Sequence, residues 1–203
     1  MFIVTIHDLK NIKKLKEAGA DAIIIGVEDF SIRQSLTISL RDLKEVVLQC
    51  HALNLKLYVN ALRFFMEDEL NLLTEFLKTC KEAGVDGIYY SDEGVFYEAQ
   101  KQGMESLLIY QPETLITNHM DIAFYLELGI QSVSLAHECS LEEILQMTEQ
   151  NKEVEILISG YFSILYSRRM LVTNYLDAIK SNEKGHKKVL DLIESTRQDR
   201  MPI

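Results

Sequence analysis

Short apolar runs recur along the chain, and the stretches between them carry apolar residues at helical spacing. At three places the sequence that leads from a helical pattern into an apolar run is nearly the same: LKEAGADAIIIG at 15–26, CKEAGVDGIYYSD at 80–92 and YLELGIQSVSLAHE at 125–138. In each, the end of an amphipathic helical pattern is followed by a glycine and then by a β-rich run. Glycine suits the left-handed position after a helix, and an apolar run suits a strand that is buried on both faces. The pattern therefore predicts helices that alternate with parallel strands.

The same reading along the whole chain predicts strands at 2–6, 22–26, 56–60, 87–91, 107–110, 132–135 and 154–159. Helical patterns lie between them, near 8–18, 40–53, 67–82, 93–102, 118–128 and 140–150. Four polar residues stand where helix N-caps are expected: Ser39, Asp92, Asn118 and Ser140. Glu143 follows Ser140 at the spacing of a capping box.

Alternating units of this kind suit either a doubly wound open sheet or a (β/α)8 barrel. No glycine-rich dinucleotide fingerprint is present, so the barrel is favoured. Only seven βα units are recognisable, and we therefore expect a parallel α/β, TIM-barrel-like fold that is incomplete, either a shortened barrel or a protomer completed by another chain. The expected organisation is a barrel-like domain at 1–176 and a charged helical C-terminal segment at 177–203, cut before the rest of a longer chain.

Composition narrows the function classes. A chain of 203 residues that is 47% hydrophobic suits one globular domain, and no apolar run approaches the roughly 20 residues of a membrane span. The three cysteines are far apart and form no C-x-x-C pair, which predicts reduced thiols in a cytoplasmic protein. A net charge of -10 argues against a strong free-standing nucleic-acid binder, because phosphate affinity rests on lysine and arginine.

Candidate chemistry lies after the predicted strands, because parallel α/β folds place function at the carboxyl ends of their strands. His137 and Glu138 are a candidate catalytic acid/base pair, although neighbours on a strand point to opposite faces. No hydrolase elbow, zinc helix or phosphate loop is evident, so no metal site is expected. An ordinary loop or capping role remains the alternative for each substrate- or anion-binding candidate in these loops, namely Arg33, Asn60, Glu113 and Asn118.

An arginine pair follows the last predicted strand, in ISGYFSILYSRRMLVTNYL at 158–176. Many barrels bind phosphate after the seventh strand, and the arginine fork matches a carboxylate or a phosphate. Gly160 allows a close backbone turn, and Asn174 adds a neutral donor. We therefore predict an anion site that includes Arg169 and Arg168, with an ion pair to a nearby acidic residue as the alternative.

Six motifs in order resemble the collagenase-like peptidases of unknown catalytic type, peptidase family thirty-two of that class: GADAIIIGVEDFSIR (19–33), YVNAL (58–62), GVDGIYYSD (84–92), ETLITN (113–118), VSLAHECS (133–140) and VEILISGYFSILYSRRMLVTNYL (154–176). The resemblance runs from about residue 2 to residue 176. It implies a barrel-based fold and usually a longer chain. One group of members, similar to this chain, supports prephenate-dependent formation of 5-hydroxyuridine at the tRNA wobble position.

The resemblance also concerns a cofactor, whose cysteine ligands this chain lacks at the matching positions. Many members carry a Glu-x-Phe-x-x-Gly pattern with a histidine and two cysteines, and some hold an iron–sulfur cluster with such cysteines. Glu155 and Gly160 match this pattern, whereas Ser159, Ser163 and Met170 replace the histidine and the cysteines. The chain is thus similar to small members without these cysteines, which are expected to bind no cluster alone and to partner a longer, cysteine-bearing paralogue.

A second departure lies at the sixth predicted strand, where His137 replaces a common arginine. The leading hypothesis is a non-catalytic or co-catalytic subunit of a tRNA-hydroxylating system, with prephenate as a candidate substrate and tRNA reached through the complex. One alternative is a peptidase that acts on protein substrates, and another is a small-molecule anion-binding barrel. A peptidase requires an activated nucleophile or a metal-bound water, and the sequence displays neither pattern. A homo-oligomer is the alternative to a complex with a paralogue.

Overall fold

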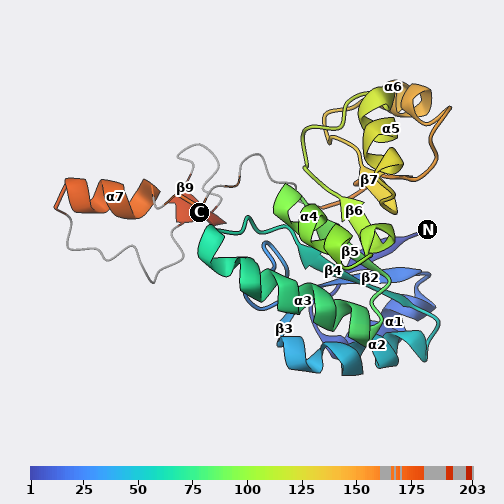
Figure 1. The fold of residues 1–203 in the computed structure, drawn as a ribbon, viewed down its shortest axis with the longest axis horizontal. Coiled ribbons are helices and arrows are strands. Elements are labelled where there is room, and N and C mark those ends of the chain that lie inside the picture. The colour runs from blue at the N-terminus through green and yellow to red at the C-terminus, as the bar shows by residue number, and fades with distance from the viewer. Residues whose placement is uncertain (161–165, 167, 170, 181–190, 194–199, 203) are drawn as a thin grey trace. The chain divides into compact units, whose positions relative to one another are not determined.

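The main feature of the computed structural model of the chain is a parallel β-sheet (Figure 1). The structure describes residues 1–160, 166, 168–169, 171–180, 191–193 and 200–202. The chain divides into two compact units, Met1–Ile164 and Leu165–Ile203. The sheet and the helices that cover it belong to the first unit.

The sheet contains eight strands, and every strand pairing in it is parallel. The main path follows the order β1 (Ile3–Thr5), β2 (Ala22–Val27), β4 (Lys56–Ala61), β5 (Gly87–Tyr90), β6 (Leu108–Tyr110), β7 (Ser132–Ser134) and β8 (Val154–Glu155), while β3 (Thr37–Ile38) pairs with β2 off this path. The seven predicted strands and the parallel α/β class are confirmed. Within the described residues β1 and β8 do not pair with each other, so the sheet is a half-barrel.

The last strand is shorter than predicted. The sequence predicts a strand at 154–159, whereas β8 contains only Val154 and Glu155. The apolar residues that follow are solvent-exposed, with Ile158 at 72%. Apolar β-rich residues form a strand only where a neighbouring strand takes up their backbone hydrogen bonds, and β7 ends at Ser134, opposite Glu155.

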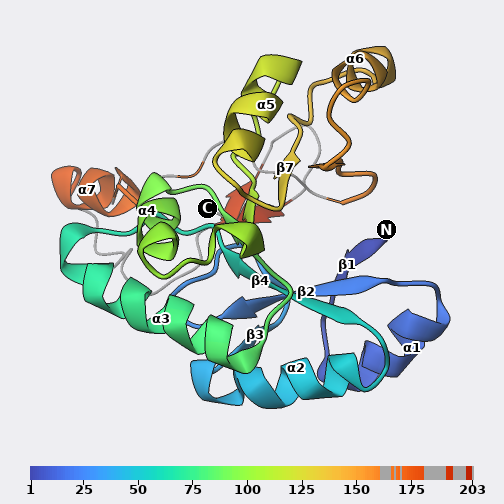
Figure 2. The same cartoon turned by 45° about the vertical axis from the view of Figure 1, so that its right-hand side comes forward.

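Six helices follow strands of the first unit: α1 (Ile12–Glu17), α2 (Leu43–His51), α3 (Leu70–Ala83), α4 (Glu93–Lys101), α5 (His119–Glu127) and α6 (Leu141–Met147). Figure 2 shows α2 and α3 side by side against the strands β2 and β4. All four predicted N-caps are confirmed. The Asp92 carboxylate accepts from the Gly94 amide at 2.8 Å, and Ser140 and Glu143 form the predicted capping box.

Residues on alternate positions of the strands face opposite sides of the sheet, which separates two apolar clusters. The larger cluster lies between the sheet and the helices and includes Ile23 and Ile25 of β2. The smaller cluster lies on the inner, concave face and contains Ala22, Tyr58, Leu62, Tyr89 and Ile109. The concave face is therefore lined in part by tyrosines rather than by aliphatic residues alone.

The second unit contains α7 (Leu171–Ala178) and an antiparallel pair of strands, β9 (Asp191–Ile193) and β10 (Arg200–Pro202). The prediction that 177–203 is helical is wrong at both strands. A charged helix that buries little apolar surface is only marginally stable, so the helical spacing of residues in this segment does not determine its structure. The domain boundary at residue 176 stays a prediction, because compactness does not test where a functional domain ends.

Candidate functional site

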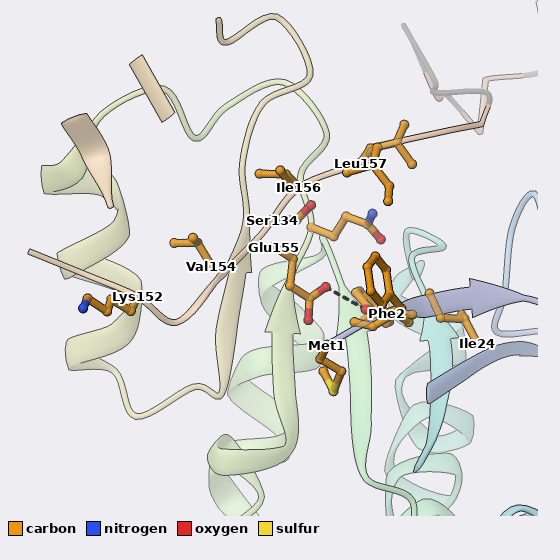
Figure 3. A pocket seen from close by; sticks show the side chains of 13 residues that line it. Met1, Phe2, Ile24, Ser134, Lys152, Val154, Glu155, Ile156 and Leu157 are labelled. Carbon is orange, nitrogen blue, oxygen red and sulfur yellow. Dashed lines mark hydrogen bonds between the residues drawn. The ribbon is translucent and has the colours of Figure 1, made fainter. Parts of the chain in front are cut away.

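A pocket of about 450 Å³ opens on the concave face of the half-barrel. It is lined by residues of β1, β2, β5 and β7 and by the stretch 152–158, so both end strands of the sheet contribute to it. Figure 3 shows the Glu155 side chain pointing into this pocket, toward Met1 and Phe2, while Val154 points to the other side. Strand alternation explains this arrangement, because neighbouring residues of a strand face opposite ways.

Glu155 is the polar centre of the pocket. Its Oε2 accepts a hydrogen bond from the Tyr89 hydroxyl at 2.7 Å, and its Oε1 accepts one from the Ser132 hydroxyl at 3.1 Å. Burial raises the pKa of the Glu155 carboxyl, and the bonds from Tyr89 and Ser132 oppose that rise. Burial and the nearby carboxylate raise the pKa of the Tyr89 phenol. Over the part of the chain that the structure describes, no cationic side chain forms an ion pair with Glu155.

Tyr58 supports Tyr89 from the neighbouring strand. The two rings meet edge to face, with centroids 5.9 Å apart and an interplanar angle of 67°. Burial, with a contribution from Glu155, raises the pKa of Tyr58 to about 12. Both phenols therefore stay protonated at neutral pH, and Tyr89 is held as a hydrogen-bond donor to Glu155.

Sequence reasoning did not select Tyr89, Ser132 or Glu155 as site residues. In the sequence, Tyr89 lies within GIYY, which resembles an ordinary buried strand, and Ser132 opens another apolar run. The signal that could have identified them is the Glu-x-Phe-x-x-Gly resemblance at Glu155, combined with the inward positions of the neighbouring strands.

Two predicted site residues, Arg33 and Glu113, do come together. Arg33 Nη2 lies 2.6 Å from Glu113 Oε1, and Nη1 donates to Oε2 at 3.0 Å, so the pair is bidentate. The pair joins the loop after β2 to the loop after β6, although β4 and β5 lie between these strands in the sheet. Both residues have left-handed backbones, with φ of 53° and 71°. A substrate-binding role for either residue stays a prediction.

Asn60, a third candidate, is buried at 2% exposure and is bound to the backbone of the same loop. Its side-chain nitrogen donates to the Ile32 carbonyl at 3.1 Å, and its oxygen accepts from the amides of Ile32 at 3.3 Å and Leu62 at 3.1 Å. The Asn60 amide therefore positions the segment that carries Arg33. Direct contact of Asn60 with a substrate stays a prediction.

Three further candidates of the first unit, Asn118, His137 and Glu138, lie at or near the starts of α5 and α6. Asn118 caps α5 and donates from its amide to Asp121 Oδ2 at 2.6 Å. His137 is half-buried with both ring nitrogens shielded from solvent, whereas Glu138 is exposed. The two members of the predicted acid/base pair thus lie in different environments, and their catalytic role stays a prediction.

The residues predicted for the anion site belong to two different units. Gly160, in the first, has a φ of 133°, which favours glycine. In the second unit Arg169 is exposed, Arg168 is half-buried, and Asn174 lies exposed on α7. Anion binding by these residues stays a prediction.

The cysteines do not fit an iron–sulfur cluster. Cys50 and Cys80 are buried in the cluster between the sheet and the helices, and Cys139 stands before α6. No three His, Cys, Asp or Glu side chains among the described residues are grouped to hold a metal ion. Two positions that the resemblance assigns to cysteine ligands, Ser163 and Met170, lie outside the described residues. In the part of the chain that the structure describes, no helix is long and apolar enough to cross a membrane.

Comparison with known proteins places this geometry in context. The chain matches peptidase family U32 over residues 7–188. It is 27% identical over 206 residues to tRNA hydroxylation protein P2 of Bacillus subtilis (strain 168), covering 99% of this chain and 67% of that protein. It is 29% identical over 180 residues to tRNA hydroxylation protein P1 of the same organism, covering 86% of this chain and 43% of that protein. The chain thus spans about two thirds of the first relative and less than half of the second.

A solved structure has the same fold. The U32 peptidase Mk0906 superposes with a TM-score of 0.59 at 14% identity, over 77% of this chain and 67% of that chain. At this identity the likeness concerns the fold alone, and it agrees with the barrel-like arrangement of the parallel strands.

Proposed function

The chain belongs to peptidase family U32, and from that membership we propose that it is a subunit of a tRNA-hydroxylating system. Its task is to support prephenate-dependent formation of 5-hydroxyuridine at the wobble position of tRNA. The observation that carries the proposal is the alignment of 99% of this chain with tRNA hydroxylation protein P2. The pocket around Glu155 supports it, since about 450 Å³ lies within the range of about 300–1,000 Å³ usual for small-molecule sites.

The partner in this proposal is a longer, cysteine-bearing paralogue in the cytoplasm, which supplies the iron–sulfur cluster and most of the RNA contact. The dispersed thiols Cys50, Cys80 and Cys139 support this division of labour. The net charge of -10 is consistent with it, because a strongly acidic chain binds phosphate backbones poorly. Arg169 and Arg168 are the proposed contacts for a carboxylate of prephenate or for an RNA phosphate.

The thiol environments disfavour the peptidase alternative. A cysteine nucleophile needs a lowered pKa, and burial instead raises the pKa of Cys50 to about 11 and also raises the pKa values of Cys80 and Cys139. A peptidase assay on gelatin and casein discriminates the two functions, and we expect no cleavage by the purified chain.

The decisive experiment is nucleoside mass spectrometry of tRNA from a strain that lacks the gene. We expect the 5-hydroxyuridine level to fall and the unmodified wobble uridine to accumulate, with restoration by the wild-type gene. A strain that lacks the cysteine-bearing paralogue serves as the positive control. Unchanged 5-hydroxyuridine in the deletion strain, together with loss in the control strain, would refute the proposed function.

A further inference from the structure

Glu155 has capacity for a ligand. A carboxylate offers about four lone-pair positions, and the bonds from Tyr89 and Ser132 use two of them. Glu155 has no cationic partner among the described residues, and a poorly solvated carboxylate without one is costly. Such a group in a pocket marks a functional site, and the ligand that suits it brings a hydrogen-bond donor.

Three further polar side chains line the same pocket: Gln111, Ser134 and the exposed Lys152. The side chains of Gln111 and Ser134 take part in no hydrogen bond with another residue that the structure describes. The Gln111 amide offers both a donor and an acceptor, and the Ser134 hydroxyl does the same. The pocket therefore presents a hydrogen-bond acceptor at Glu155 and, beside it, two groups that can both donate and accept. This arrangement suits a ligand whose donors and acceptors alternate.

Apart from Lys152, the remaining lining side chains are apolar. Figure 3 shows Phe2, Ile24 and Leu157 around the space into which Glu155 points. Phe2 and Tyr89 are the aromatic side chains of this lining, and aromatic faces favour a planar ring, because every base can stack on them. A planar heterocycle with alternating donors and acceptors along one edge is the chemical class that fits both features.

We propose that this pocket receives one extruded uracil base, with Glu155 accepting a hydrogen bond from the N3–H of the base and Gln111 donating to an adjacent carbonyl oxygen. The inference rests on the proposed function, which supplies uridine as the substrate. Enzymes that modify a base take it out of the stack and bind its Watson–Crick edge in a pocket. A carboxylate at this edge selects uracil over cytosine, because N3 of cytosine is an acceptor and carries no hydrogen.

The test measures binding of fluorescein-labelled anticodon stem-loop RNAs by fluorescence anisotropy at fixed salt. It uses the full chain in complex with the cysteine-bearing paralogue, because the paralogue supplies most of the RNA contact in the proposed function. The RNAs share one sequence and carry uridine, N3-methyluridine or cytidine at the wobble position. We expect the uridine RNA to bind about ten- to a hundredfold more tightly than the other two, the range for losing one charge-assisted hydrogen bond. Glu155→Gln should reduce this preference severalfold or more, because the amide oxygen is a weaker acceptor and the amide nitrogen accepts no hydrogen bond.

The matched control is Glu153→Gln, which makes the same charge change two residues away at an exposed position outside the pocket lining. It should retain the full preference. Equal binding of the three RNAs, absence of binding, or an unchanged preference in Glu155→Gln would each overturn the inference. The deletion strain decides the proposed function separately: lost hydroxylation with no uridine preference overturns only the pocket inference, and retained hydroxylation with a clear preference overturns only the proposed function.

Discussion

Tyr89 on β5 donates a hydrogen bond to Glu155 on β8 at 2.7 Å, although β6 and β7 lie between these strands in the sheet. A flat sheet would hold the two side chains about 14 Å apart, given a spacing of about 4.8 Å between strands. The contact is therefore a consequence of the curvature of the half-barrel, which turns the inner side chains toward one another. The hydrogen bond at the polar centre of the pocket therefore depends on the curvature of the sheet.

Glu155 should make the stability of the protein depend on pH. Its pKa is raised above the ordinary value of 4.5, so the native state holds this proton more tightly than the unfolded chain does. The stabilisation is full below 4.5 and is lost as the pH rises through the native pKa. Glu155→Gln removes this dependence, so we expect the variant to gain stability relative to wild type as the pH rises through that window. Urea denaturation of both proteins across the window measures the difference.

Tyr89→Phe provides the complementary change. It removes a hydrogen bond that lowers the pKa of Glu155, so the pH dependence of stability in this variant should extend to higher pH than in the wild type. The exposed control Glu153→Gln should leave the pH profile unaltered. If Glu155→Gln and wild type have parallel profiles, Glu155 has an ordinary pKa and the description of its environment is wrong.

Asn60→Ala should destabilise the protein by about 2–3 kcal/mol. The substitution removes three hydrogen bonds to the backbone and leaves backbone groups of half-buried Ile32 and buried Leu62 without these partners. Asn118→Ala is the comparison, since an exposed N-cap typically contributes about 1 kcal/mol. Chemical denaturation gives both values. A loss at Asn60 no larger than that at Asn118 would show that the loop does not depend on this amide.

Much of the fold could be predicted because its signals are local. A glycine after a helix, such as Gly84 with a φ of 79°, and a capping side chain before a helix act within a few residues of the chain. The alternation of such signals defines a parallel sheet without knowledge of any long-range contact. Asn118 and Ser140 were correctly predicted as caps for the same reason.

The polar centre of the pocket could not be predicted in this way. Tyr89 and Glu155 lie 66 positions apart, and their contact depends on strand order, register and curvature together. The Arg33–Glu113 pair has the same character, with 80 positions between its members. Both residues were selected from the sequence as separate candidates, but nothing in the sequence indicates that each is the other's partner.

A double-mutant cycle should give a coupling energy of about 1 kcal/mol between Arg33 and Glu113. Their side chains are 39% and 16% exposed, and the guanidinium contacts both carboxylate oxygens. The coupling energy should therefore lie at the upper end of the range for surface ion pairs and decrease as the salt concentration rises. The cycle uses Arg33→Ala, Glu113→Ala and the double variant in urea denaturation. The Lys13–Glu17 pair, 3.9 Å apart and 75% and 64% exposed, is the control and should show coupling near zero. Equal coupling in the two pairs would contradict the special role of the bidentate contact.

The purified chain should contain no iron–sulfur cluster. Cys50, Cys80 and Cys139 are dispersed, and burial raises the pKa of each thiol, which opposes the thiolate form that binds iron. Iron and sulfide analysis after anaerobic purification checks this, with the cysteine-bearing paralogue purified in parallel. Stoichiometric iron and sulfide in this chain alone, with a visible charge-transfer band, would contradict it.

The last prediction concerns Arg169, which is exposed in the second unit. Arg169→Ala should weaken binding of prephenate by about ten- to a hundredfold, because one charge-assisted hydrogen bond is lost, and an exposed side chain should leave the melting temperature nearly constant. Arg169→Lys should restore binding only in part, since a point charge lacks the bidentate fork. Arg41→Ala, an exposed change of the same charge, is the control. Calorimetric titration measures the affinity. A large fall in melting temperature with unchanged affinity would identify Arg169 as a structural residue.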